Sequence, residues 1–542
     1  MAGRAPVVPL LAAVLLSLFA IAAPSLAVPD AKPKGDADTK LAEEAALRKD
    51  TRKVADKFAE KLAPVVKFAV SKGLKDEAGE LLAVLKKNAP EYKKLADLEQ
   101  AVADCGPPAD ATKTDADKKE LAGQTARAYD AHAKDLVKLG MSCVKFKMYA
   151  RAFDLVNQVL DFDPDNREAR QILGYQRHPN DSKKWITKFE AQVMRDGAGL
   201  VDEMNPKGSE KTAHVLFVNA DGKPECWIPK KDLSQWQKGL RPFAHTWATE
   251  EQETKGRRRN EEAGWIVESE HFRIRTTISR AAAYEFGWEL LEDYYTAFLR
   301  HYFNFFEADA GAQLLFDVKD KNKAPKKHVV LLFPKQEDYE SHVKDLHGAS
   351  ELLLRSAGFY TGGGDRCSHF FAVADRSRTL EVLYHEVAHQ LFEETKSSGR
   401  GSEGNNWVPE GTAMYSETWA KVNGRWIPGY RKDVQGLREM KKYLAQDQSF
   451  SLASFIAIDH KEFHDPARRT FNYFMAQALS YFLMQYDDER YKEDFVQFIR
   501  AYYEGKVKAN SLPDYIQVEG TKDAQKRLDI LGTQFKEFMS KL

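Results

Sequence analysis

The chain has 542 residues, enough for two to four domains, and 43% of them are hydrophobic, enough for ordinary buried cores. Its 81 Lys and Arg residues balance its 81 Asp and Glu residues, so the formal net charge is zero. Zero net charge offers no electrostatic basis for binding nucleic acid or anionic membranes, and we expect neither partner.

Residues 1–27 have the pattern of a secretory signal peptide. Arg4 supplies the positive start, residues 7–23 are apolar, and residues 25–27 form a small-residue cleavage site. An uncleaved anchor is the alternative, but the apolar stretch is short and contains Pro9. No later stretch is long and apolar enough to cross a bilayer. We therefore expect an exported protein, periplasmic or secreted, with no transmembrane span after signal removal.

Residues 28–40 are rich in Pro, Asp and Lys, which predicts a flexible linker. Leu and Ala then recur at helical spacing over residues 41–178, which predicts a helical domain. Part of that domain resembles one tetratricopeptide-type helical hairpin, on Leu139, Gly140, Tyr149, Ala150, Ala152, Phe153, Pro164, Ala169 and Tyr175. A stable stack needs about three such units. The domain is therefore either a peptide- or partner-docking surface or a helical spacer or propeptide.

The chain contains four cysteines, Cys105, Cys143, Cys226 and Cys367, for which three pairings are open. Cys105 and Cys143 both lie in the helical region and could form a bridge. A buried thiol is the expectation for Cys367. None of the four has the C-x-x-C spacing, so we expect no cysteine metal site.

Residues 179–262 predict a small mixed domain, with a strand at 215–218, that ends in a charged run. We interpret that run, residues 250–262, as an exposed linker. The following segment alternates strands near 264–267, 271–276 and 328–333 with helices at 281–306 and 339–346. This order is typical of a sheet-bearing lobe over 263–395, which ends in one more strand and the helix described next.

That helix carries His385, Glu386 and His389 in the pattern HEVAH. Two His residues at i and i+4 lie on one helical face and can bind one Zn²⁺, while the intervening Glu points at the metal-bound water. A surface helix with two unrelated histidines is the alternative. Apolar residues surround the helix on most sides and favour a buried site: Leu380, Val382, Leu383, Val387, Ala388, Leu391 and Phe392.

A third ligand follows downstream, in the segment WVPEGTAMYSE. Phe392 and Thr395 stand where a three-histidine zinc motif would need Gly and His, so that branch is excluded. Glu410 follows His389 by twenty-one positions, enough for a loop and an antiparallel return. Two His and one Glu leave a fourth position for water, which is the arrangement of a catalytic zinc site.

These two motifs together resemble the gluzincin metallopeptidases, and the second resembles the aminopeptidase-N-type segment Asn-Glu-Gly-Phe-Ala followed by Tyr and Glu. The matching residues are Glu410, Gly411, Ala413, Tyr415 and Glu417, whereas Pro409 and Thr412 depart from the pattern. Residues 263–500 more widely resemble bacterial peptidase-MA-like, zincin-type domains of unknown function. The exopeptidase motif Gly-Ala-Met-Glu-Asn is absent, which argues against N-terminal trimming.

The resemblance implies roles for these residues. His385, His389 and Glu410 would bind zinc, Glu386 would be the general base, and Glu417 could hold a ligand His from behind. A gluzincin also needs a donor for the oxyanion from the helical lobe. Tyr473 is our candidate, with His460 and His464 as alternatives.

Substrate in gluzincins pairs with an edge strand just before the zinc helix. Residues 369–374, which follow a Gly-rich turn, predict that strand here. We therefore expect an α+β fold: a two-lobed zincin with a mixed sheet lobe at 263–395 and a helical lobe at 396–542, preceded by the helical domain. The expected function is zinc-dependent hydrolysis of peptides or proteins. The alternatives are a degenerate zincin that serves as a binding scaffold, and a zinc hydrolase of non-peptide amides or esters.

Overall fold

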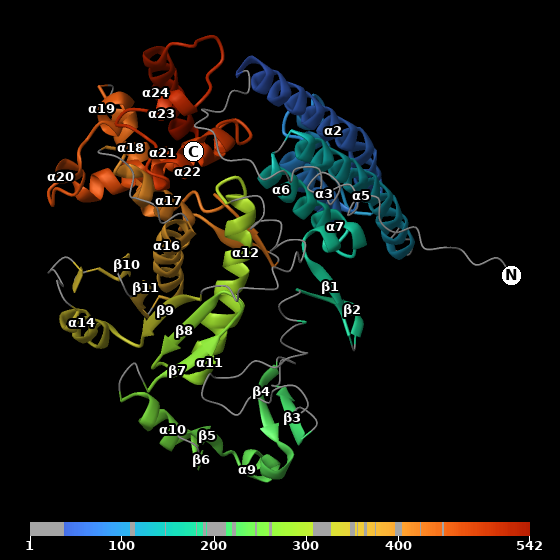
Figure 1. Cartoon of the computed structure of the whole chain (residues 1–542). Coiled ribbons are helices and arrows are strands. Elements are labelled where there is room, and N and C mark those ends of the chain that lie inside the picture. The colour runs from blue at the N-terminus through green and yellow to red at the C-terminus, as the bar shows by residue number, and fades with distance from the viewer. Residues whose placement is uncertain are drawn as a thin grey trace, which may run out of the picture. The chain divides into compact units, whose positions relative to one another are not determined.

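The computed structural model describes residues 37–542, except for 109–113, 147, 180, 188–190, 192–212, 219–223, 244–245, 260–262, 307–326, 347–352, 355, 363–365, 374, 396–403, 423 and 447–448. The predicted signal peptide, residues 1–27, lies outside the described residues, and so does most of the predicted linker. Contacts divide the chain after Tyr175 into two units, which we describe separately (Figure 1). In the described part of the chain, no helix is long and apolar enough to cross a membrane.

The first unit is built from helices. They are α2 (Ala37–Ser71), α3 (Lys75–Asn88), α4 (Leu95–Ala103), α5 (Thr114–Lys145), α6 (Tyr149–Phe162) and α7 (Arg167–Ile172). The long helix α5 packs against both α2 and α6. Their shared core includes His132, whose ring stacks on Phe58 at 3.9 Å between centroids. Burial lowers the pKa of His132 to about 4, so this histidine is neutral in the folded protein at pH 7.

The cysteines of this unit are not joined. Cys105 and Cys143 are both buried thiols, so the bridge considered between them is not formed. Cys367, in the second unit, is a buried thiol as expected. Burial without oxidation makes these residues small apolar core groups.

The second unit begins with short hairpins. These are β1 (Tyr175–His178) with β2 (Asp181–Thr187), β3 (His214–Val218) with β4 (Pro224–Pro229), and β5 (Arg241–Phe243) with β6 (Thr246–Ala248). A 3₁₀ turn, Lys230–Asp232, and α9 (Leu233–Gln237) lie between the last two hairpins, and α10 (Glu250–Arg257) follows β6.

Helix α10 corrects one sequence interpretation, because residues 250–257 are not an exposed linker. Thr249 begins the helix with a capping box. Glu253 is buried and pairs with Arg257 at 2.9 Å and with Arg280 at 2.8 Å, and it accepts a hydrogen bond from Trp265 Nε1. A buried carboxylate needs such partners to offset its desolvation, and together they attach α10 to the sheet-bearing part.

A five-stranded mixed sheet has the order β10-β11-β9-β8-β7. Its strands are β7 (Trp265–Glu268), β8 (Phe272–Thr276), β9 (His328–Phe333), β10 (Gly358–Thr361) and β11 (Cys367–Phe371). Strands β8, β9 and β11 are parallel, and the two outer strands are antiparallel to their neighbours. The connections contain α11 (Arg280–Tyr284), a π-helical turn (Glu285–Leu290), α12 (Leu291–His301) and α14 (Gln336–Asp345). The expected α+β class and the strand at 328–333 are thus confirmed.

The edge strand differs from the prediction. The strand before the helix that carries the HEVAH motif, β11, is internal, because β10 pairs with its outer side and β9 with its inner side. The edge on this side is β10, which precedes the Gly-rich segment in the chain and pairs antiparallel with β11, with Gly358 opposite Phe370. Residues 358–361 were not predicted as a strand, so the antiparallel pairing that makes β11 internal was missed.

Helix α16 (Arg376–Thr395) follows the sheet, and it contacts β10, β11 and α17 (Trp407–Ser416) (Figure 1). The remaining elements are mainly helical, as expected. They are β12 (Ala420–Val422), β13 (Arg425–Ile427), α18 (Gln435–Gln446), α19 (Leu452–Ile456), α20 (His460–Phe463), α21 (Arg469–Gln485), α22 (Lys492–Tyr503), α23 (Leu512–Tyr515) and α24 (Ala524–Lys541).

Helix α17 lies unusually close to α21 at one glycine. A Cβ atom on Gly411 would lie 2.5 Å from Ser480 Oγ and 2.6 Å from the Ala476 carbonyl oxygen. No side chain fits at these distances, so the absence of one permits the close approach. This close packing of α17 on α21 fixes the position of the neighbouring residue, Glu410.

We predict that Gly411→Ala lowers the free energy of unfolding by about 1–3 kcal/mol, because overpacking outweighs the gain in helix propensity. Urea denaturation checks this. Gly532→Ala in α24 is the matched control, since its Cβ would come no closer than 3.5 Å to Leu452 Cβ. The control should be neutral or stabilising, and an equal loss in both variants would contradict the packing argument.

Candidate metal centre

The helix that carries the HEVAH motif is anchored to the sheet by polar contacts on its back face. Ser368 Oγ on β11 donates to Gln390 Oε1 at 2.9 Å and lies 3.2 Å from the Glu386 carbonyl oxygen. Gln390 Nε2 donates to the Val329 carbonyl oxygen at 3.1 Å. Sequence reasoning missed Ser368 and Gln390. Gln390 could have been found, because it is a polar residue directly after His389 on an otherwise apolar helix.

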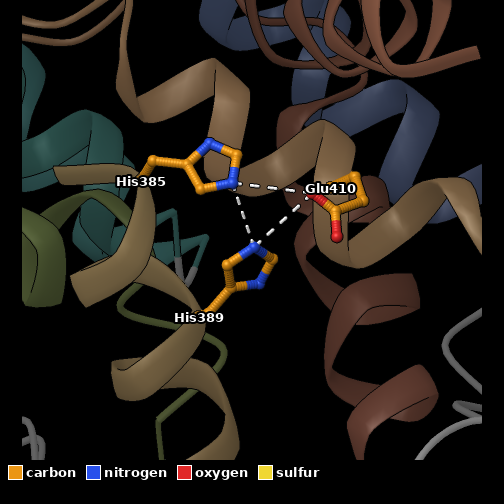
Figure 2. Close-up of side chains that lie close together, drawn as sticks. All are labelled: His385, His389 and Glu410. Carbon is orange, nitrogen blue, oxygen red and sulfur yellow. Dashed lines mark hydrogen bonds and ion pairs between the residues drawn. The ribbon is translucent and has the colours of Figure 1, made fainter. Parts of the chain in front are cut away.

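Two helices bring together the three side chains that the sequence predicts as metal ligands. His385 and His389 lie one turn apart on α16, and Glu410 faces them from the first turn of α17 (Figure 2). The two Nε2 atoms are 3.2 Å apart, and Glu410 Oε2 lies 3.5 Å from His385 Nε2 and 3.6 Å from His389 Nε2. Within the described residues, these three form a group that could hold a metal ion.

The donor atoms fit a tetrahedral ion. Ligands about 2.0–2.1 Å from zinc in a tetrahedron lie about 3.3–3.4 Å from one another. The three measured separations, 3.2, 3.5 and 3.6 Å, bracket that value without any shift of the side chains. Two imidazole nitrogens and one carboxylate oxygen are also a donor set that zinc accepts.

Glu417 contacts the ring nitrogen of His385 that faces away from the other two donors. Its Oε1 atom lies 2.9 Å from His385 Nδ1, and both side chains are largely buried. A carboxylate there favours the tautomer with the proton on Nδ1, which leaves the lone pair of Nε2 directed at the other two donors. The structure thus brings Glu417 against His385, the contact through which we expect it to orient a ligand histidine.

Burial and pairing set the pKa values of the two carboxylates in opposite directions. Burial alone would raise the pKa of Glu410, but the charge of His389 and hydrogen bonds with both histidines outweigh it and lower that pKa. Burial raises the pKa of Glu386, and the nearby histidines only partly oppose it. Burial would likewise lower the pKa of His385, but hydrogen bonds with Glu410 and Glu417 raise it well above the usual value.

Glu386 lies between the histidines and the edge strand. Its side chain is buried, and a Cβ on Gly358 would lie 3.1 Å from Glu386 Cγ, 2.7 Å from Val382 Cγ1 and 2.9 Å from the His369 carbonyl oxygen. Strand β10 therefore passes close to α16, and only glycine permits that approach. Sequence reasoning noticed the glycine without assigning it this contact.

The three oxyanion candidates lie together on the helical side. Tyr473 OH is 3.4 Å from His464 Nδ1, and the His460 and His464 rings are 4.4 Å apart between centroids. Burial raises the pKa of Tyr473, and the charge of Glu410 and a hydrogen bond with it raise it further. The tyrosine therefore lies beside the metal-binding carboxylate and stays protonated as a hydrogen-bond donor at neutral pH.

We predict that His385→Ala, His389→Ala and Glu410→Ala each abolish stoichiometric zinc binding. Each change leaves only two protein ligands, fewer than the three that hold a catalytic zinc ion. Metal analysis after dialysis against zinc measures this. His460→Ala removes a nearby histidine outside the triad and should retain one zinc per chain. Retention of zinc by all three triad variants would refute the assignment.

Replacement of the supporting carboxylate should weaken the site without destroying it. We predict that Glu417→Gln lowers zinc affinity about 10–100-fold, since the amide cannot accept the Nδ1 proton as strongly as the carboxylate does. Competition with a chromogenic chelator measures the affinity. A change of less than about twofold would show that His385 is oriented by its packing alone.

Comparison with known proteins identifies one family model, and no curated protein or solved structure matches the chain. Residues 379–506 match the model described as "Protein of unknown function (DUF1570)". The match covers less than half of the chain. The match leaves out the strand residues near the centre. It contains the centre's other residues, which are His385, Glu386, His389, Glu410, Glu417, His460, His464 and Tyr473.

Proposed function

We propose that this protein is an exported zinc-dependent peptidase of the gluzincin type, acting on peptides or proteins. The observation that carries the proposal is the tetrahedral spacing of three donors, His385, His389 and Glu410, next to the buried carboxylate of Glu386. Three protein ligands rather than four leave a position for water, as catalysis requires. The sheet-bearing residues 263–395 and the helical residues 396–542 would form the two lobes of a zincin around this centre.

Zinc held by the triad would supply a Lewis acid that activates water and polarises a carbonyl group. Glu386 would accept the proton of the attacking water and pass it to the leaving amine. Burial raises the pKa of Glu386 in the metal-free site, which favours a carboxylate that can both accept and release a proton.

Tyr473 would donate a hydrogen bond to the carbonyl oxygen as negative charge develops there. Its hydroxyl lies beside Glu410 and next to His464, on the side of the centre formed by α21. A donor already in place costs no reorganisation during the reaction, which is why such groups contribute strongly to catalysis. His464 would hold the tyrosine hydroxyl in position.

Strand β10 would hold the substrate. It is one of the two edge strands of the sheet, and it pairs only with β11 among the described residues, while Gly358 brings its backbone close to Glu386. An extended peptide could add to this edge by main-chain hydrogen bonds, which bind any sequence and place a peptide bond beside the catalytic carboxylate. We therefore assign substrate binding to β10 in place of residues 369–374.

We predict that Glu386→Gln keeps one zinc per chain but lowers peptide hydrolysis by about 10²–10⁴-fold, because the amide cannot accept a proton. The assay is cleavage of a quenched peptide library by the zinc-loaded protein. Glu381→Gln is the matched control on the same helix, where the carboxylate pairs with Arg431 at 2.6 Å. The control should retain most activity.

Two outcomes would contradict the proposal. Equal hydrolysis by the wild type and Glu386→Gln would remove the mechanism. Failure of the zinc-loaded wild type to cleave any peptide would remove the peptidase function, and a parallel panel of esters and non-peptide amides would then separate another hydrolase from a non-catalytic scaffold.

A further inference from the structure

The register between β10 and β11 shows which side chains of the edge strand face α16. Residues that pair directly on neighbouring strands point to the same face of a sheet. Tyr360 pairs with Ser368, whose hydroxyl donates to Gln390 Oε1 on α16 at 2.9 Å. Gly358, two residues before Tyr360, lies on the same face, where a Cβ atom would be 3.1 Å from Glu386 Cγ. The side chain of Tyr360 is therefore the first one on β10 that follows Gly358 on the face carrying the catalytic motif.

The hydroxyl of Tyr360 is directed into the protein. Its oxygen lies 3.5 Å from Oε1 of Glu394, in the last turn of α16. The same carboxylate accepts a hydrogen bond from Gln390 Nε2 at 3.0 Å and pairs with His328 Nδ1 at 2.8 Å. Burial and the charge of Glu394 raise the pKa of Tyr360, so its hydroxyl stays protonated and faces the carboxylate as a donor. Because Tyr360 is only half-buried, its ring is the part that remains open to a ligand.

A peptide that adds to β10 would continue this register by one strand. It would occupy the side of β10 that has no partner strand among the described residues. The peptide residue opposite Gly358 would lie beside Glu386. The residue opposite Tyr360 would be two positions further along, about 6–7 Å away, with its side chain on the same face. Cross-strand neighbours have Cβ atoms about 4.5–5.5 Å apart, so that side chain would contact the ring of Tyr360.

We propose that Tyr360 is a specificity-determining residue, whose ring contacts the side chain of the substrate residue opposite it and favours a large apolar group there. The proposal rests on the peptidase function and on pairing with β10, and it adds a substrate class to them. Backbone pairing accepts any sequence, whereas the alternate side chains of an added strand provide selectivity. A ring with its hydroxyl engaged offers apolar contact, and aromatic or β-branched neighbours gain most from it. A charged side chain would lose water without gaining a counter-charge from Glu394, which is already paired with His328.

The test uses zinc-loaded, full-length protein and alanine pentapeptides that carry a hydroxamate, which binds zinc and fixes the distance of each residue from the metal. A single Phe replaces each Ala in turn. One series has the hydroxamate at its C-terminus and the other at its N-terminus, so both directions from the metal are covered. Calorimetry gives the dissociation constants for the wild type, Tyr360→Thr, Tyr360→Phe and Phe359→Leu.

Phe359→Leu is the matched control for the face of the strand. Phe359 pairs with His369 and stacks on its ring at 4.5 Å between centroids. That ring lies 3.2 Å, Nδ1 to Nε2, from His342 on α14, so Phe359 points away from α16. Tyr360→Thr removes the ring but keeps a residue that favours strands, and Tyr360→Phe removes only the hydroxyl.

We expect the wild type to bind the peptide with Phe at one position about 2–10-fold more tightly than the all-alanine peptide. Lys at that position should give no such gain. Tyr360→Thr should lose the preference while it keeps zinc and the affinity for the all-alanine peptide. Tyr360→Phe and Phe359→Leu should both keep the preference at that position.

Equal binding of every Phe peptide and the all-alanine peptide by the wild type, an undiminished preference in Tyr360→Thr, or failure of every hydroxamate to bind would each overturn the subsite. Cleavage of a quenched peptide library distinguishes this from failure of the proposed function. Cleavage without a preference that depends on Tyr360 removes only the subsite. A binding preference without any cleavage removes the peptidase and leaves the peptide-binding subsite.

Discussion

The candidate centre depends on the depth at which α17 is seated between α16 and α21. Glu410 reaches the two imidazoles only because Gly411, its neighbour, lets α17 lie against Ser480 and Ala476 with no side chain between them. The result is three donor atoms separated by 3.2–3.6 Å. A shift of α17 by the width of one methyl group would spoil that spacing, since interiors are close-packed and relax only partly.

The surroundings of the donors shift the pKa values of two chemically identical carboxylates in opposite directions. Glu410 faces two imidazoles and keeps its charge, whereas Glu386 is buried with less compensation and has a raised pKa. A charged carboxylate suits a metal ligand, and a carboxylate that exchanges protons suits a general base. Glu417 and the Ser368–Gln390 contact complete the arrangement, because they orient the ring of His385 and anchor α16 to the sheet.

Two features of the surface around the centre have consequences for substrates. On one side, the sheet ends in β10, whose Gly358 contacts the catalytic-motif helix. On the other side, α20 and α21 bring Tyr473 together with His460 and His464. In the proposed peptidase, the first feature would pair with an extended backbone of any sequence, and the second would supply the hydrogen-bond donor to the oxyanion.

The sequence by itself determined what depends on local periodicity. Residues four apart on a helix share a face, so His385 and His389 could be paired in advance, and Glu410 and Glu417 were found from a second motif with its own spacing. The strand at 328–333 and the long C-terminal helices also follow from local pattern. Only the tertiary structure decided which strand is the edge and that Glu253 and Arg257 are buried as a pair. Each outcome depends on segments that are distant along the chain, because those segments supply the pairing strand or the counter-charge. The spacing of residues within one element does not encode such contacts.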